Sequence, residues 1–420
     1  MKVCVLGLGY IGLPTALLLA QKHQVVGVDI NQKIVTTLNN EKLPFEEPGL
    51  EELMNSVKGH FTASRTVVPA DVFLIAVPTP LEGSMKIAGL TYVRSAAEMI
   101  APHLQNENLV ILESTVPPGT SERLVLPILK RKGVKKLYFS HCPERAIPGK
   151  TIFEMVHNDR IIGGIDKTSS ERTKELYASF VKGNFNVTDV HTAEFVKLME
   201  NTFRDVNIAL SNEFALMAEE SKINIWEAIE LANKHPRVDI LKPGPGVGGH
   251  CIAIDPWFLT ENSTKFRIIP IARQINDSMP NHVLLIVRKI LKGMEDVTIT
   301  VFGVAYKGDV GDARETPALK FIKLAENEGY QVKCFDPFVK QFEYPVFSLE
   351  QSLSGSDCIV LLTDHTIFTT IDPFTISMRQ KNLVDTRNIL DHARWMDAGF
   401  TVKILGNGMF SNTVKTDTHE

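Results

Sequence analysis

Cysteine is scarce in this chain, because its 420 residues include only five, and no two of them have C-x-x-C spacing. This usage argues against a disulfide framework and favours a reducing, cytoplasmic location. An excess of charge of one sign is also missing, since 45 basic residues face 49 acidic ones and the formal net charge is −4. Such a balance excludes a protein built to coat nucleic acid.

Long uncharged runs are equally rare. The run at 3–20 has no charged residue and follows a lysine, so it imitates a signal peptide or a membrane span. Three glycines and a proline interrupt it, and a second strand-like run follows at once. We therefore interpret it as a strand, a turn and a helix, and we expect no membrane partner.

The chain does contain 44% apolar residues, which is enough for a sizeable core. Short β-branched runs alternate with helical patterns in 1–190, long helical periodicity fills 191–290, and strands return in 291–410. Continuous apolar strands separated by helices indicate a parallel sheet covered on both faces, so the predicted class is α/β, then all-α, then α/β. The expected strands are 3–6, 25–29, 72–77, 109–113, 137–140, 299–303, 332–336, 358–363 and 382–386. A polar, flexible tail is expected at 411–420.

The helical region contains one unusually long segment. From 192 to 223 there is neither proline nor glycine, which predicts a single helix that spans between domains or packs against a partner subunit.

A glycine turn predicts the cofactor site. The segment Gly7-Leu8-Gly9-Tyr10-Ile11-Gly12 follows a predicted strand and opens a helix, as dinucleotide-binding fingerprints do. Gly7 permits the tight turn, Gly9 lets backbone approach a pyrophosphate, and Gly12 allows close packing of helix on strand. Asp29 ends the next predicted strand, where its carboxylate would bond the ribose and repel a 2′-phosphate. The predicted cofactor is therefore NAD.

Two further turns follow predicted strands that end at the same edge of the sheet. One is Val-Pro-Thr-Pro with Thr79, and the other is Glu-Ser-Thr-Val-Pro with Thr115. Ligands of open parallel sheets bind at that edge, so both threonines are candidate contacts to the cofactor.

The sharpest chemical signal is the loop KPGPGVGGHCIAID at 242–255, in which four glycines and two prolines precede Cys251. Glycines cost backbone entropy, so such a loop suits a backbone that must approach a bulky ligand. A thiol there is a candidate nucleophile, although a tight turn with an incidental cysteine is the alternative. Asp255 is expected to share a helical face with Cys251 and to hold a proton or water. His250 has no further ligands at metal spacing, so no metal is predicted.

A polar stripe lies on the predicted long helix. Glu194, Lys197 and Asn201 occupy positions i, i+3 and i+7, and Arg204 extends the stripe by a turn. Alone, this pattern would indicate a solvated face. Beside a thiol and a nicotinamide site, Lys197 becomes a candidate to neutralise an alkoxide or to take its proton.

Together these segments resemble the UDP-glucose/GDP-mannose dehydrogenase family, in order and spacing, to about residue 408. The matching segments are GLGYIG, VPTP, ESTVPPGT, CPER, AEFVKLMEN, GPGVGGHCIAID, FGVAYKGDVGDARETPA and VDTRN. The resemblance implies two Rossmann-like domains joined by a long helix that forms a homodimer. It also implies oxidation of the C6 alcohol of a nucleotide sugar to a carboxylate with two NAD⁺.

The resemblance further implies roles for single residues. Cys251 matches the nucleophile that captures the aldehyde as a thiohemiacetal and then carries the thioester. Lys197 matches the acid/base or alkoxide-stabilising lysine, with Asn201 beside it. Asp255 matches the carboxylate that positions water, and Glu144 the acid near the thioester. Positions that match contacts to the sugar nucleotide are Arg145, Ala146, Arg204, His235, Arg237, Gly249, Tyr306, Lys307 and Arg387, and Arg314 matches a residue near the cofactor pyrophosphate.

At the cysteine the chain departs from glucose-oxidising members, which read G-G-S-C-F-x-K-D. His250 replaces the serine and Ile254 the lysine. This variant is similar to the branch that acts on UDP-2-acetamido sugars, so UDP-N-acetylmannosamine is the expected substrate, as a source of uronic acid for cell-surface polysaccharide. UDP-N-acetylglucosamine is the nearest competitor, followed by UDP-glucose and GDP-mannose. A two-electron 3-hydroxyacid-type dehydrogenase would not need Cys251, and a non-catalytic NAD-binding redox sensor is the alternative from another class.

Overall fold

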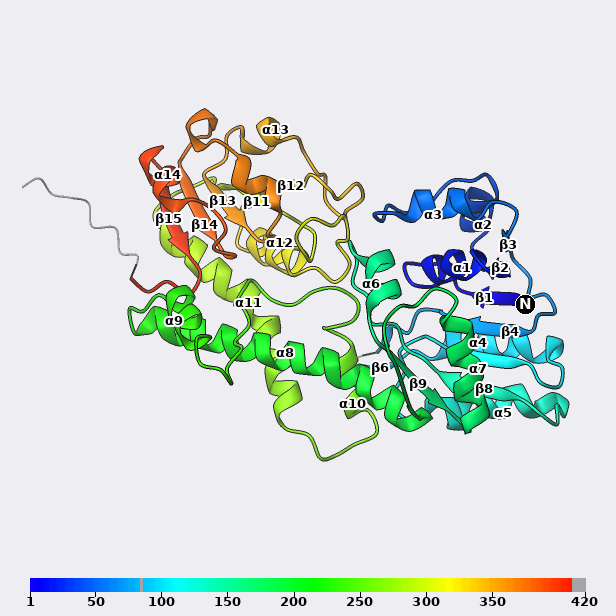
Figure 1. The fold of residues 1–420 in the computed structure, drawn as a ribbon. Helices are drawn as coiled ribbons and strands as arrows, with labels where there is room; N and C mark the ends of the chain where they lie inside the picture. Colours follow the sequence, from blue (N-terminus) through cyan, green and yellow to red (C-terminus); the bar gives the residue numbers. More distant parts are fainter. Residues whose placement is uncertain (84–85, 410–420) are drawn as a thin grey trace, which may run out of the picture. The chain divides into compact units, whose positions relative to one another are not determined.

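The computed structural model describes residues 1–83 and 86–409 (Figure 1). The chain divides into two compact units. The first contains Met1–Asn201 and Ile254–Lys265, and the second contains Thr202–Ala253 and Phe266–Glu420. The tail predicted at 411–420 lies outside the described residues.

An eight-stranded sheet forms the centre of the first unit, in the order β10-β9-β8-β7-β4-β1-β2-β3. Its strands are β1 Lys2–Leu6, β2 Gln24–Val28, β3 Phe61–Ser64, β4 Val72–Ile75, β7 Leu109–Leu112, β8 Tyr138–His141, β9 Arg160–Gly164 and β10 Phe185–Asp189. Neighbouring strands are parallel except β8 and β9, which are antiparallel. A small antiparallel hairpin is formed by β5 Leu81–Glu82 and β6 Ile87–Ala88.

Helices cover both faces of this sheet. They are α1 Gly12–Ala20, α2 Gln32–Asn39, α3 Leu50–Ser56, α4 Thr91–Ile100, α5 Leu126–Leu129, α6 Thr151–His157, α7 Lys167–Tyr177 and α10 Asp255–Thr260, with short turns at Ala101–His103, Ser121–Val125 and Lys130–Lys132. Val3 of β1 packs in one apolar cluster with Leu17 of α1, whereas Cys4 packs in another with Val93 of α4. Successive strand residues point to opposite faces, which is why a doubly covered strand is apolar throughout.

The second unit is built on a five-stranded parallel sheet, in the order β12-β11-β13-β14-β15. Its strands are β11 Thr298–Phe302, β12 Gln331–Phe335, β13 Cys358–Leu361, β14 Asn382–Asp385 and β15 Thr401–Ile404. Its helices are α9 Ile225–Ala232, α11 Ile268–Ile290, α12 Pro317–Asn327, α13 Leu349–Leu353 and α14 His392–Asp397, with short turns at Thr366–Thr370 and Pro373–Thr375. Val301 packs with Phe321 of α12, and Phe302 packs with Trp395 of α14.

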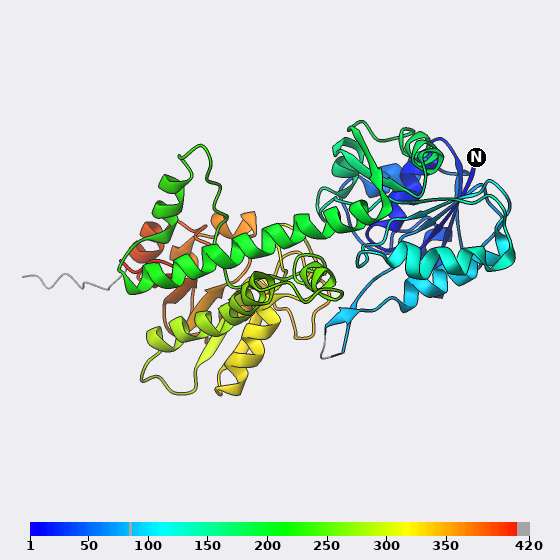
Figure 2. The ribbon, with the colours of Figure 1, turned by 90° about the horizontal axis from the view of Figure 1, so that it is seen from below.

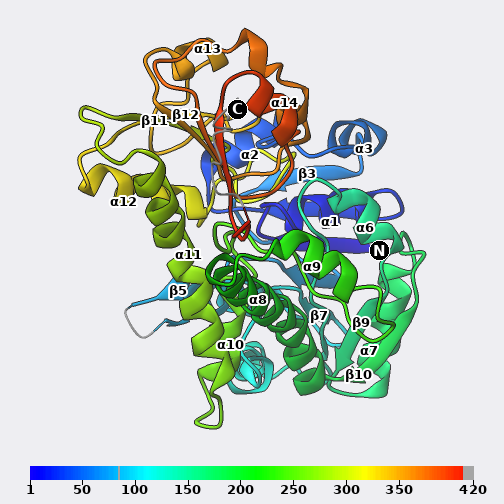
Figure 3. The ribbon, with the colours of Figure 1, turned by 90° about the vertical axis from the view of Figure 1, so that its left-hand side faces the viewer.

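The long predicted helix is α8, Val190–Glu220, which is seen from the side in Figure 2 and nearly end-on in Figure 3. It ends near its predicted limit, because Lys222 has a left-handed φ of 57° and the N–H of Ile223 bonds back to the carbonyl of Ala218. Phe195, Met199 and Phe203 follow one another at intervals of four residues on this helix, and they are 45%, 50% and 66% exposed.

The predicted α/β class, with two Rossmann-like sheets and a long helix, is confirmed. The predicted strands all form, and the uncharged run at 3–20 becomes β1, a turn and α1. No helix of the described residues is long and apolar enough to cross a membrane. The sequence patterns did not indicate β3, β9, β10 or β15.

Candidate active site

The glycine turn between β1 and α1 has the geometry of a phosphate-binding turn. Gly7 has a φ of 92°, and a Cβ added there would lie 2.3 Å from the carbonyl oxygen of Ala76. A Cβ on Gly12 would lie 2.0 Å from the carbonyl oxygen of Gly7. Gly9 differs, because it is exposed and a Cβ there would meet nothing within 4 Å. Two glycines thus serve packing, and the third leaves open space at a helix start, as the predicted approach of a pyrophosphate requires.

Asp29 is held beside this turn. It directly follows β2, and its carboxylate accepts hydrogen bonds from the backbone N–H of Leu8 at 3.0 Å and of Asn31 at 2.8 Å. The residue is only half-buried, so its remaining lone pairs are available to ribose hydroxyls. Tyr10 of the turn stacks on Phe45, with ring centroids 4.2 Å apart.

The turns that carry Thr79 and Thr115 are tied to each other. They follow the neighbouring strands β4 and β7. The hydroxyl of Ser114 accepts from the N–H of Val77 at 2.8 Å and donates to its carbonyl at 2.7 Å. Both threonines are half-buried, at the same edge of the sheet as the glycine turn.

Lys197, Asn201 and Asp255 form a buried polar cluster in the first unit, with exposures of 8%, 7% and 3%. The side-chain amide of Asn201 donates to the Asp255 carboxylate at 2.6 Å. Burial raises the pKa of Asp255 to about 6, and the Lys197 ammonium and the Asn201 amide limit that rise. A carboxyl with such a pKa exchanges its proton near neutral pH, as a group that positions and activates water must. The helix face that carries Lys197 and Asn201 is thus buried rather than solvated.

The expectation that Asp255 and Cys251 share a helical face is wrong. Residues 250–254 form turns, and α10 begins only at Asp255. Pro256 explains this start, because proline fits the first turn of a helix, where its missing N–H costs nothing. Cys251 is exposed and belongs to the second unit.

The glycines before Cys251 allow close packing within the second unit. A Cβ on Gly249 would lie 2.8 Å from the ring of Tyr306, and one on Gly244 would lie 2.5 Å from the Arg387 guanidinium. The sequence interpretation assigned this closeness to a ligand. In the structure, the groups close to these two glycines are the side chains of Tyr306 and Arg387, which are themselves predicted nucleotide contacts.

His250 is tied to the segment that contains Arg314. The N–H of Gly249 donates to the carbonyl of Arg314 at 3.1 Å, and the Arg314 guanidinium lies 2.7 Å from Nε2 of His250. Asp312 pairs with the same guanidinium. Burial and the Arg314 charge lower the pKa of His250, so the ring is neutral and accepts the bond.

The predicted nucleotide contacts of the second unit lie at the carboxyl ends of its strands. Tyr306 and Lys307 follow β11, and Arg387 follows β14. The Arg387 guanidinium donates to Asp364 at 2.9 Å. Burial raises the pKa of Asp364, but the neighbouring Arg387 outweighs it and leaves that pKa below its usual value.

Glu144 and Arg145 are engaged within the first unit. The Glu144 carboxylate is 7% exposed and accepts from the N–H groups of Arg145 at 2.7 Å and Ala146 at 2.8 Å. The Arg145 guanidinium pairs with Glu200 at 2.7 Å. Arg160, a buried arginine that no sequence pattern indicates, lies 2.6 Å from Glu144.

Three predicted substrate residues lie on the surface. Arg204, His235 and Arg237 are exposed, and Nδ1 of His235 accepts from the N–H of Arg237 at 3.3 Å. All three belong to the second unit, whereas the buried cluster belongs to the first. Among residues 1–83 and 86–409, no group of three His, Cys, Asp or Glu side chains is arranged to hold a metal.

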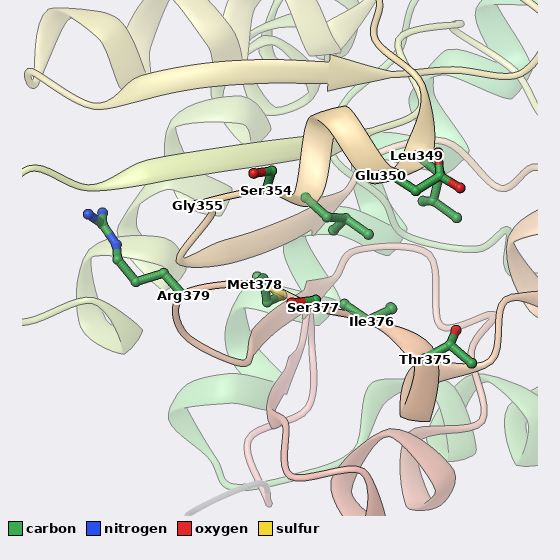
Figure 4. A pocket seen from close by; sticks show the side chains of 10 residues that line it. Leu349, Glu350, Ser354, Gly355, Thr375, Ile376, Ser377, Met378 and Arg379 are labelled. Carbon is green, nitrogen blue, oxygen red and sulfur yellow. The ribbon is translucent and has the colours of Figure 1, made fainter.

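A hollow of about 570 Å³ opens elsewhere in the second unit (Figure 4). It is lined by Leu349, Glu350, Leu353, Ser354, Gly355, Thr375, Ile376, Ser377, Met378 and Arg379. Ser354 precedes β13 and Arg379 precedes β14, so the hollow lies at the amino ends of these strands. The predicted nucleotide contacts lie at the opposite edge, and the hollow is therefore not their site.

Three sequence profiles of one family match the chain. The NAD binding domain of the UDP-glucose/GDP-mannose dehydrogenase family matches residues 1–181, its central domain 191–278 and its UDP binding domain 300–392.

Individual relatives match almost the whole chain. A UDP-N-acetyl-D-mannosamine dehydrogenase of Methanococcus maripaludis is 50% identical over 420 residues, or 97% of each chain. An NDP-N-acetyl-D-galactosaminuronic acid dehydrogenase of Ralstonia nicotianae is 41% identical, over 92% of this chain and 96% of the relative. The solved structure of a UDP-D-ManNAc dehydrogenase from Pyrococcus horikoshii superposes with a TM-score of 0.91 at 41% identity, over 98% of this chain and 100% of that one.

Proposed function

The chain belongs to the UDP-glucose/GDP-mannose dehydrogenase family, and from this premise we propose that it oxidises the C6 alcohol of UDP-N-acetyl-D-mannosamine to the carboxylate. The buried cluster of Lys197, Asn201 and Asp255 carries the proposal, because it places an ammonium beside a carboxyl that titrates near pH 6. The high identity to UDP-N-acetyl-D-mannosamine dehydrogenases supports the choice of sugar. The product is a uronic acid nucleotide, which would serve synthesis of a cell-surface polysaccharide.

NAD⁺, when bound, accepts a hydride from C6 of the sugar. The chain holds it through the open turn at Gly9 and the Asp29 carboxylate. In the first oxidation, Lys197 stabilises the C6 alkoxide as an ammonium, or takes the C6 hydroxyl proton as a neutral amine, while the hydride leaves and the alcohol becomes an aldehyde.

A second oxidation needs a tetrahedral carbon, because an aldehyde has no alcohol proton to lose. The Cys251 thiolate adds to the aldehyde and forms a thiohemiacetal, and transfer of the second hydride to a second NAD⁺ would give a thioester. Water positioned by Asp255 opens the thioester, releasing the carboxylate and restoring the thiol. Glu144 lies near the thioester in this scheme, and its charge contributes to the same step.

The substrate choice is tested by measuring NADH release from UDP-N-acetylmannosamine, UDP-N-acetylglucosamine, UDP-N-acetylgalactosamine, UDP-glucose and GDP-mannose. We expect the first to have the highest kcat/KM, with two NADH formed per sugar. The third is included because a relative named for N-acetylgalactosaminuronic acid is 41% identical. A higher kcat/KM for UDP-glucose or GDP-mannose would contradict the proposal.

The exposed apolar side chains on α8 support a homodimer. Phe195, Met199 and Phe203 recur every four residues, so they lie on one side of the helix. A row of large exposed apolar side chains marks an interaction surface. Phe203→Glu should shift the protein to a monomer in light scattering, whereas Phe153→Glu, at a comparably exposed phenylalanine on α6, should not. An unchanged mass for Phe203→Glu would contradict the predicted interface.

A further inference from the structure

Three charged side chains meet in the interior of the first unit. Glu113, Glu144 and Arg160 are 2%, 7% and 2% exposed. Nη1 of Arg160 lies 2.6 Å from Oε2 of Glu144 and 3.5 Å from Oε1 of Glu113. One guanidinium therefore faces two carboxylates in a place where an unpaired charge is costly.

The single antiparallel pair of the sheet creates this arrangement. Glu113 and Glu144 follow β7 and β8, at the carboxyl ends of these strands, whereas Arg160 is the first residue of β9. Because β9 is antiparallel to β8, with His141 opposite Gly163, its first residue lies at the carboxyl end of β8. A parallel β9 would place Arg160 at the other edge of the sheet. The reversed strand thus delivers the arginine to the edge where cofactor and substrate residues gather.

Glu113 belongs to the cofactor side of the same edge. It directly precedes Ser114 and the turn of Thr115, and its carboxylate accepts from the hydroxyls of Thr15 on α1 at 3.1 Å and Tyr177 on α7 at 3.0 Å. Burial raises the pKa of Glu113 to about 7, Arg160 opposes that rise, and Glu144 adds to it.

The histidine, the thiol and the phenol beside Glu113 do not change their charge near neutral pH. On β8 and just after it, burial lowers the pKa of His141 to about 3 and raises the pKa of the Cys142 thiol to about 12. Burial also raises the pKa of Tyr177 well above its usual value. Thr15 on α1 and Met155 on α6, which touch each other, do not titrate. Among these groups, Glu113 is therefore the one whose pKa lies near neutral pH.

We propose that Arg160 is a positioning residue that holds the Glu144 carboxylate, and that Glu113 competes for the same guanidinium. When Glu113 is protonated, the Arg160 charge is paired with Glu144 alone. When Glu113 is ionised, the two carboxylates share it and Glu144 is held less tightly. The inference rests on the proposed role of Glu144 near the thioester.

Two variants test the inference in the full-length enzyme, with the best sugar of the substrate panel and saturating NAD⁺. Glu113→Gln preserves the shape and keeps one of the two oxygens that accept from hydroxyls, but it cannot ionise. We expect the native kcat to show an inflection near pH 7 in addition to the one near pH 6 that Asp255 gives, and the variant to lack only the inflection near pH 7. Arg160→Lys keeps the charge but cannot span both carboxylates, so kcat should fall about tenfold while both KM values stay within about twofold.

Arg273→Lys is the matched control, because Arg273 of α11 is also 2% exposed and pairs with a buried carboxylate, Asp205. It should lower the melting temperature about as much as Arg160→Lys, without changing the pH profile of kcat. The inference is overturned if Glu113→Gln keeps the inflection near pH 7, or if Arg160→Lys loses no more kcat than the control.

Glu144→Gln separates this inference from the proposed function. If it leaves kcat unchanged, the role assigned to Glu144 fails, and the inference fails with it. If it lowers kcat while Arg160→Lys does not, only the positioning role of Arg160 is lost. Should Arg160→Lys fail to fold, the nearly isosteric Glu113→Gln still decides the matter.

Discussion

In both units the first strand of the sheet ends in a glycine with positive φ, Gly7 after β1 and Gly303 after β11. Each donates its N–H at 2.8 Å to the last residue of the neighbouring strand, Val28 in one case and Phe335 in the other. The turns then diverge. The first unit has the open Gly9 two residues later, and α1 starts at Gly12. The second has the buried Ala305, and α12 starts only at Pro317.

The acidic residue after the second strand also differs in its bonding. Asp29 accepts two backbone N–H groups and stays half-exposed. Asp336 is 6% exposed, and its carboxylate accepts from His365 and from the N–H groups of four residues. These are Val304, Ala305, Phe338 and Val339. The first acid has capacity left for a ribose, and the second does not.

One backbone plan thus supports two kinds of nucleotide site. The first unit offers a helix start and a half-exposed carboxylate, which suit a dinucleotide. In the second, the carboxylate fixes the turn, and the predicted ligand contacts are the side chains of Tyr306, Lys307 and Arg387, which follow the strands. The match of a UDP binding domain to residues 300–392 agrees with this difference.

The largest expected effect follows from the division of chemistry between the units. Cys251 is the one proposed reacting group in the second unit, so Cys251→Ala should lower uronate formation by about a thousandfold or more, while binding of NAD⁺ and UDP-sugar persists. Product is measured by chromatography after incubation with both substrates. Cys358→Ala, at a fully buried thiol of β13, is the control and should keep its activity. Near-native uronate from Cys251→Ala would eliminate the covalent mechanism.

The sequence predicts most of the fold for a physical reason that also explains its failures. Strands covered on both faces are continuously apolar, and these were found. The missed β9 reads Arg-Ile-Ile-Gly-Gly, in which an arginine and two glycines hide the pattern. The missed β10 lies at the edge of its sheet, and its residues are exposed or half-buried, so no apolar run marks it.

The site residues, like the strands, divide into those that a local sequence pattern indicates and those that it does not. The glycine turn is a local pattern and is readable along the chain. The predicted roles of Lys197 and Asp255 also start from local patterns, whereas the role of Asn201 rests on the family resemblance alone. Their grouping joins residues 54 positions apart, Asn201 and Asp255, which no local pattern reveals. Arg160 was missed because its importance lies only in the carboxylates that the fold brings to it. The individual site roles and the boundaries near residues 190 and 290 stay predictions.

A second prediction contrasts the two acids through stability. Asp336→Asn replaces one acceptor oxygen with an amide that faces donors, so we expect a loss of about 3 kcal/mol in the free energy of unfolding. Urea unfolding of the purified protein measures it. The KM for NAD⁺ should stay within about twofold, because the first unit is untouched. A stability loss no larger than that of Asp29→Asn would contradict the view that the hydrogen bonds of Asp336 hold the turn after β11 in place.

The smallest effect concerns the acid of the first unit. The Asp29 carboxylate is expected to bond the ribose hydroxyls. Loss of an ionised hydrogen-bond acceptor weakens the affinity for a ligand about tenfold. Asp29→Ala should therefore raise the KM for NAD⁺ about tenfold. It should also reduce the ratio of kcat/KM for NAD⁺ to that for NADP⁺, because the native carboxylate repels the 2′-phosphate of NADP⁺. Asp29→Asn is the matched variant, because it keeps an oxygen for the N–H of Leu8 while removing the charge.

If Asp29→Asn narrows the preference for NAD⁺ as far as Asp29→Ala does, charge decides between the cofactors. If only Asp29→Ala does, the acid acts by shaping the turn. A native enzyme that already prefers NADP⁺ would contradict the role of Asp29 in repelling the 2′-phosphate.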